Sequence, residues 1–172
     1  MAEYLIDPRR STPAYALGER QMLEAWLEFH RTTLLLKCEG LGPDQLRLRP
    51  VKTSLLSLHG LVRHMADVER GWFTRTLLRA PETPYLYRDA SGNEAEFVPL
   101  ESADWEHDLA TWQEECQRSR DNAARFNLDD AGLRRGKEVS LRWVYAHMVE
   151  EYARHNGHAD LIREMIDGTV GW

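Results

Sequence analysis

The stretch that most constrains the fold runs from Ser140 to Gly168 and reads SLRWVYAHMVEEYARHNGHADLIREMIDG. Serine is a residue that caps helix N-termini, and glycine commonly ends helices, so the stretch predicts one helix of about seven turns. At about 100° per residue, several apolar side chains fall within about 40° of His155. They are Val144, Met148, Ala159, Ile162 and Ile166. We therefore expect this stripe of the helix to face the core.

Glu151 lies in the middle of this apolar stripe, one turn before His155, whereas Glu150 points towards solvent. Burying an unpaired carboxylate costs roughly several kcal/mol, so Glu151 must be paired, protonated or bound to a cation. A glutamate and a histidine four residues apart project side by side and supply two ligands of a metal site. The spacing alone leaves two interpretations open, a buried hydrogen-bonded Glu–His or Glu–Arg pair and part of a metal centre.

Three further segments have apolar residues at helical spacing, and we expect helices over about 17–38, 57–79 and 103–126. The connection at 39–56 is predicted to hold one helical turn from Asp44 to Leu48, and the connection at 127–139 is polar. Four amphipathic helices with long connections predict an all-α four-helix bundle. The length of 172 residues, without repeats or a linker, predicts one domain over residues 1–172.

The longest break between helices, from Pro81 to Glu101, contains two prolines and a turn-like SGNE sequence. Irregular connections of this length in compact domains are commonly functional. We expect this segment to form a lid over one end of the bundle, with Tyr85 and Tyr87 as contacts for a bound molecule. The alternative is a packed surface loop.

Several histidines other than His155 are candidates for the same site. His30 lies within the stripe of the first helix, either as a hydrogen-bonded core residue or as a group lining the cavity of Glu151. In the second helix His64 lies on the shoulder of the apolar stripe, whereas His59 is predicted to face solvent. In the last helix His158 could orient a ligand or lie exposed, and His147, one turn before Glu151, lies further off the stripe.

Composition excludes several classes of function. The net charge of −6 and the pI near 5.7, without a basic cluster to offset them, argue against nucleic acid as a partner. No apolar run approaches the ~18 residues that span a bilayer, and no signal peptide is recognisable, so a cytoplasmic protein is expected. The two cysteines, Cys38 and Cys116, have no metal-type spacing and are expected to be core residues rather than catalytic thiols.

The segments SLLSLHGLVRHMADVERGWF, HMVEEYARHNGHADLIREMIDG and LLLKCEGL resemble helices of the DinB/YfiT-like superfamily, in the branch called "mini-circle protein". The resemblance covers most of the chain and implies a bundle that holds a divalent metal ion. Many of these proteins use three histidines, the last two spaced as His-x-x-x-His. Here the motif is Glu-x-x-x-His, which is similar to the mycothiol-dependent maleylpyruvate isomerases. Carried over by position, the implied metal ligands are His64, Glu151 and His155.

Two histidines and one carboxylate leave a coordination position open, which is typical of a catalytic metal site. The resemblance thus implies zinc, or alternatively nickel, and a metal-dependent transferase or isomerase that uses a low-molecular-weight thiol. Because arginine far outnumbers lysine, as in GC-rich bacteria, mycothiol is the first thiol to consider. The alternatives are a stress-related protein that binds a metal or small ligand without turnover, and a metal-dependent hydrolase. A homodimer is also expected, with Trp172 and the N-terminal arm as apolar contact surface.

Overall fold

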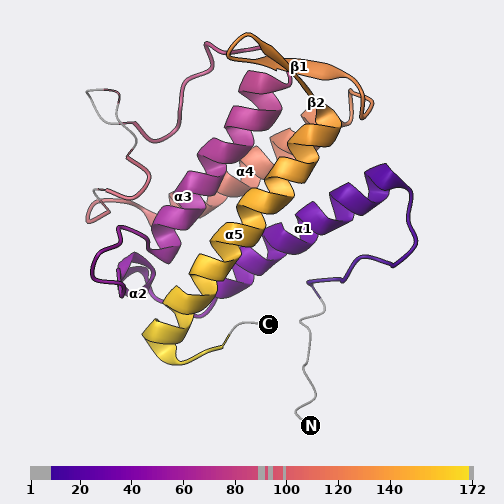
Figure 1. The fold of residues 1–172 in the computed structure, drawn as a ribbon. Helices are drawn as coiled ribbons and strands as arrows, with labels where there is room; N and C mark the ends of the chain where they lie inside the picture. Colours follow the sequence, from indigo (N-terminus) through magenta and orange to yellow (C-terminus); the bar gives the residue numbers. More distant parts are fainter. Residues whose placement is uncertain (1–8, 89–91, 93–94, 99, 171–172) are drawn as a thin grey trace.

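The computed structural model describes residues 9–88, 92, 95–98 and 100–170, and this part of the chain is mostly helical (Figure 1). The long helices are α1 (Glu19–Cys38), α3 (Leu58–Glu69), α4 (Trp105–Ala123) and α5 (Leu141–Asp167). The helix α3 continues as a π-helix, η1 (Arg70–Thr76), and a short helix α2 (Pro43–Arg47) lies where the single turn was predicted. The predicted helical fold is therefore confirmed.

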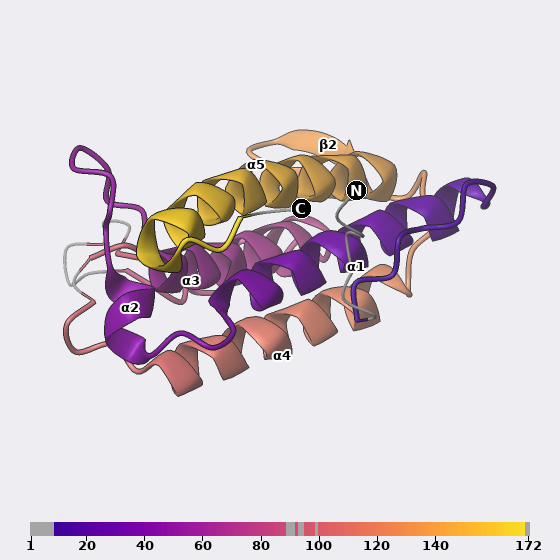
Figure 2. The same cartoon turned by 90° about the horizontal axis from the view of Figure 1, so that it is seen from below.

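The long helices run side by side around one hydrophobic core. The helix α1 packs against α5, α3 packs against α4, and α3 also contacts both α1 and α5. Figure 2 shows α5 and α4 on opposite sides of the molecule, with α1 and α3 between them. None of the helices in the described ranges has a window apolar and long enough to cross a membrane.

The helix α5 has the limits that its capping residues predict. The hydroxyl of Ser140 accepts a hydrogen bond from the backbone N–H of Trp143 at 3.2 Å, which satisfies one free donor of the first turn. Gly168 ends the helix with a φ of 79°, a left-handed conformation that glycine adopts without strain. The apolar stripe is buried as predicted at Val144, Met148, Ala159 and Ile162, and Ile166 is partly buried.

A buried polar network joins the helices inside this core. The carboxylate of Glu69 accepts two hydrogen bonds from the guanidinium of Arg31, at 2.8 and 2.7 Å, and one from the hydroxyl of Tyr152 at 2.7 Å. That hydroxyl in turn accepts a hydrogen bond from the indole of Trp112 at 2.9 Å. Glu69 and Tyr152 have no exposed surface, so these bonds offset the cost of burying the charges.

A β-hairpin occupies much of the connection before α5. Strand β1 (Ala131–Arg134) pairs antiparallel with β2 (Lys137–Ser140), and the turn residues Arg135 and Gly136 have positive φ angles of 49° and 78°. Positive φ at both positions is typical of the tight turns that match the twist of paired strands. Gly132 holds the hairpin against η1, because a Cβ atom there would lie 2.2 Å from the backbone oxygen of Thr76.

The prediction that His59 faces solvent is wrong. Its side chain has no exposed surface, and its Nε2 atom lies 2.8 Å from a carboxylate oxygen of Asp108 in α4. The prediction assumed that α3 buries one face only. In the structure α3 contacts α1, α2, α4 and α5, so side chains outside its main stripe are buried too.

Candidate metal centre

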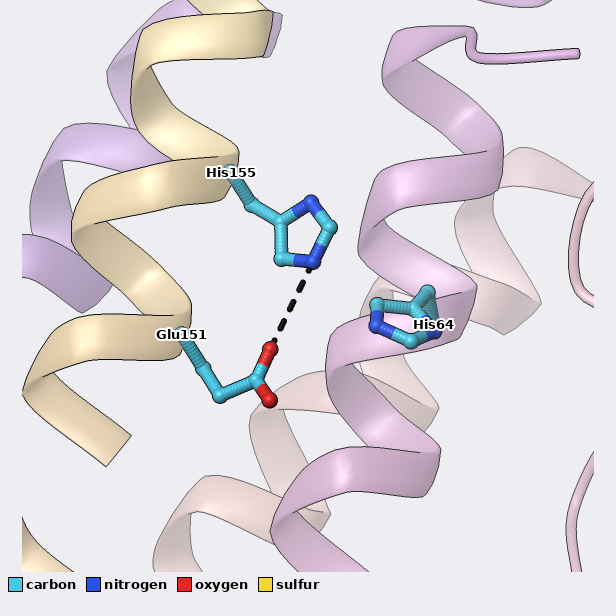
Figure 3. A group of neighbouring side chains, drawn as sticks. All are labelled: His64, Glu151 and His155. Atoms are coloured by element: carbon cyan, nitrogen blue, oxygen red, sulfur yellow. Dashed lines mark ion pairs between the residues drawn. The ribbon is translucent and has the colours of Figure 1, made fainter. Parts of the chain in front are cut away.

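The three predicted metal ligands lie together where α3 faces α5. Figure 3 shows Glu151 and His155 on successive turns of α5, with the imidazole of His64 opposite them on α3. One nitrogen from each imidazole and one carboxylate oxygen all lie within 4.8 Å of one another. The Nε2 atom of His155 is 3.6 Å from the nearer carboxylate oxygen of Glu151, and the two imidazole rings are 4.8 Å apart between centroids.

The three side chains are neither fully buried nor freely exposed. Their exposed fractions are 25% for His64, 20% for Glu151 and 12% for His155. The adjacent imidazoles, that of His155 foremost, lower the pKa of the Glu151 carboxyl despite its partial burial. The group therefore combines an ionised carboxylate with two imidazoles, and all three side chains are partly exposed to solvent.

Two further histidines of α5 contact this group. The Nε2 atom of His147 lies 3.2 Å from a Glu151 oxygen, and the His147 ring stacks on that of Trp143 at 4.9 Å between centroids. The Nδ1 atom of His158 lies 3.4 Å from that of His155. Groups in these positions can fix the orientation of metal-binding side chains. Angular position on the helix did not predict the contact of His147, because its imidazole reaches Glu151 from outside the stripe.

The loop after η1 adds a carboxylate that sequence reasoning missed. Glu96 has only 7% exposure, and its Oε1 atom lies 3.9 Å from Nδ1 of His64. The ring of Phe97 covers the same imidazole at 5.6 Å between centroids. No local pattern distinguishes Glu96 from other loop glutamates, so its position depends on tertiary structure. The described part of the Pro81–Glu101 segment therefore borders the site, and positions 89–91, 93–94 and 99 lie outside the described residues.

Neither His30 nor Glu150 lies within the group of His64, Glu151 and His155, although Glu150, His147 and Glu151 also offer donor atoms within 4.8 Å of one another. The side chain of His30 lies in α1 beside Asn156, whose amide nitrogen is 3.0 Å from the backbone oxygen of His30. Glu150 is half-exposed, as predicted, and pairs with Arg154 at 2.5 Å. His30 is therefore a half-buried residue that contacts Asn156, and Glu150 lies on the helix surface.

The chemistry of the donors fits a divalent metal ion. Donor atoms around a tetrahedral zinc ion lie roughly 3.5 Å apart, given bond lengths of about 2.0–2.2 Å. The separation of 3.6 Å between Glu151 and His155 matches this spacing. The full group spans up to 4.8 Å, so small rotations of the side chains would bring all three donors to the bonding distance.

Comparison with known proteins gives an independent indication of what the chain is. The family model described as "Mycothiol-S-transferase" matches residues 22–168, from within α1 to the glycine that ends α5. A search of the curated proteins found no match. The matched region covers most of the chain and contains all three residues of the candidate metal centre. The chain thus belongs to the mycothiol S-transferase family, within the DinB/YfiT-like superfamily.

Proposed function

We propose that the protein is a metal-dependent enzyme that joins the sulfur of mycothiol to an electrophilic carbon of a small molecule, with release of the thiol proton and of the group that the sulfur displaces, such as a halide. The observation that carries the proposal is the convergence of His64, Glu151 and His155 within 4.8 Å. Two imidazoles and one carboxylate are the ligands of a metal site with an open position. Membership of a family of mycothiol S-transferases supplies the thiol that such a position would take.

In this proposal each residue of the site has a distinct role. His64, Glu151 and His155 hold the ion, which we propose to be zinc, with nickel as the alternative. Zinc would favour the deprotonated and nucleophilic form of a thiol in its open position. His147 and Glu96 restrain Glu151 and His64, and the ring of Phe97 shields one side of the site from water.

Thiol consumption provides the test of this function. The metal-loaded protein is expected to accelerate the reaction of mycothiol with an electrophile such as chlorodinitrobenzene or a bimane. Glutathione and bacillithiol serve as comparison thiols, and Glu151→Ala protein measures the background. Equal rates for the two proteins would reject the transferase and favour a protein that binds metal or a small ligand without turnover. Hydrolysis of the electrophile without loss of thiol would indicate a metal-dependent hydrolase.

The protein's own cysteines are not needed as nucleophiles in this reaction. Both are buried, and burial raises the pKa of Cys38 to about 12 and that of Cys116 further still. Cys38→Ser and Cys116→Ser proteins are therefore expected to retain the transfer rate of the unmodified protein within about twofold. Steady-state kinetics at one protein concentration measures this. A rate loss in either variant, with folding and metal content intact, would assign that thiol a role in the chemistry.

We also propose that the protein forms a homodimer. The suggested contact surface, Trp172 and the start of the N-terminal arm, lies outside the described residues. Light scattering during gel filtration is expected to give twice the chain mass of 20.0 kDa. A mass of one chain at high protein concentration would reject the dimer.

A further inference from the structure

Besides the candidate metal centre, the structure has a pocket between η1 and the β-hairpin. It has a volume of about 300 Å³. Three arginines line it, Arg75 from η1 and the consecutive pair Arg134 and Arg135 from the hairpin. The rest of the lining consists of Thr76, Pro81, Tyr85 and Leu133. The pocket exists because Gly132 lets the hairpin rest directly on the backbone of η1.

The three arginines have no carboxylate partner among the described residues. Arg75 lies over the ring of Tyr85 at 4.2 Å and donates to the backbone oxygen of Thr83. Arg134 lies over the ring of Trp72 at 3.9 Å, and Arg135 is exposed. Burial and the charges of Arg135 and Arg75 lower the pKa of Arg134. The like charges repel one another, and a bound anion would relieve that repulsion.

In another cavity of similar volume the arginines are paired with carboxylates. It lies between α1, η1, α4 and α5 and is also lined by charged side chains. There Arg31 and Arg120 both form ion pairs with Glu28, at 2.6 and 2.8 Å. The arginines of that cavity are already neutralised by carboxylates, whereas those of the hairpin pocket are not. Unneutralised arginines therefore distinguish the hairpin pocket as a site for an anionic ligand.

A short chain of contacts connects the pocket to the candidate metal centre. The guanidinium carbon of Arg134 lies 3.9 Å from the centroid of the Trp72 ring. The centroid of that ring lies 4.5 Å from the centroid of the His147 ring. His147 in turn lies 3.2 Å from Glu151. The rings of Trp72 and His147 thus separate Arg134 of the pocket from Glu151 of the candidate metal centre.

We propose that this pocket binds the anionic group, a carboxylate or a phosphate, of the electrophile that accepts the thiol. The inference rests on the proposed transferase function. A guanidinium offers paired donors that match the oxygens of either anion. Mycothiol, a sugar–inositol conjugate, carries no ionised group besides its thiol and has no need of three arginines. The arginines therefore select the second substrate, which is a small organic acid.

Equilibrium binding tests the pocket without any turnover. The metal-loaded protein, without thiol, is titrated by calorimetry with 4-nitrobenzoate, with inorganic phosphate and with the neutral 4-nitrobenzamide. We expect the anions to bind, and Arg134→Gln and Arg135→Gln each to weaken them at least about tenfold. The control is Arg118→Gln, which removes a half-exposed arginine of α4 that pairs with Glu115 and does not line the pocket. Stronger binding of nitrobenzoate or of phosphate identifies the acidic group.

Equal binding of the acid and the amide would overturn the proposal. Binding unchanged in both pocket variants would do the same. Because Arg135 is exposed in a turn, its variant is expected to fold even if loss of the Trp72 contact disturbs Arg134→Gln.

Turnover of a matched pair of electrophiles separates this inference from the proposed function. The pair is 4-chloro-3-nitrobenzoate and its benzamide, which differ in charge at one group. We expect kcat/KM with mycothiol to favour the benzoate at least about tenfold, and Arg135→Gln to abolish the preference. Equal kcat/KM values would reject the pocket assignment and leave the transferase standing. Anion binding that depends on Arg135, without turnover of either electrophile, would reject the transferase and leave the anion site standing.

Discussion

Alanine at His64, Glu151 or His155 is expected to remove the stoichiometric metal from the purified protein. Each substitution takes away one of the three proposed protein donors, which lie within 4.8 Å of one another. Loss of an outer residue that merely orients a ligand costs about 10–100-fold in metal affinity. Loss of a ligand is expected to cost more than about 100-fold, and thiol transfer should fall with it. Elemental analysis of dialysed protein measures the metal content.

The matched control is Glu150→Ala, one residue before Glu151 on the same helix. Glu150 is half-exposed and pairs with Arg154, so its loss should leave about one metal ion per chain. Circular dichroism of all four variants checks that the helices are intact. If the three ligand variants keep one ion per chain, the metal is bound elsewhere and the assignment fails.

Substitution of Glu69 by alanine is expected to give the largest loss of stability among single polar replacements in the core. It would leave the guanidinium of Arg31, which has 4% exposure, without its buried partner. Breaking a buried ion pair on one side typically costs about 3–5 kcal/mol. The hydroxyl of Tyr152 would lose its acceptor as well. Urea denaturation should show the loss as a lower free energy of unfolding.

Glu28→Ala is the control, because Glu28 pairs with the same guanidinium at 2.6 Å from the helix surface. Its side chain is 44% exposed, so its removal should cost only about 0–1 kcal/mol. The double replacement Arg31→Met with Glu69→Leu should recover much of the loss, since no unpaired charge stays buried. Equal destabilisation by Glu69→Ala and Glu28→Ala would mean that burial does not determine the strength of this pair.

The helices could be predicted because their signals are local. Ser140 and Gly168 define the ends of α5 through their own backbone and side-chain geometry, and the 3.6-residue repeat identifies its buried face. The hairpin before α5 was predicted only as a polar connection. Its strands have four residues each, and their position depends on the contact of Gly132 with η1, which joins residues far apart in the sequence. His59 was misplaced because periodicity does not show how many neighbours surround a helix.

In the candidate site, too, the contacts within one helix could be predicted, whereas the contacts between distant segments could not. Glu151 and His155 are neighbours through helix geometry alone, so their proximity follows from spacing. Periodicity favoured His64 over His59 as the histidine of α3 that reaches inwards, and the family resemblance then assigned it as a ligand. Glu96 could not be found, because a loop glutamate reaches His64 only through the path of the chain between η1 and α4. The arginine pocket was also missed, because Arg134 and Arg135 belong to a connection that was predicted only to be polar, and it is the hairpin that brings them to Arg75.

The last residue of the hairpin is also the cap of the helix that carries Glu151 and His155. Ser140 ends β2, and its hydroxyl accepts the N–H of Trp143 in the first turn of α5, so no linker separates the two elements. A ligand that shifts the hairpin on η1 would therefore act on the start of α5 as well. Any such influence is reciprocal, because the factor by which one ligand tightens the other is the same in both directions. Occupancy of the arginine pocket and of the metal centre would then be thermodynamically linked, and metal binding would change the affinity for the acid by the same factor as the acid changes the affinity for the metal.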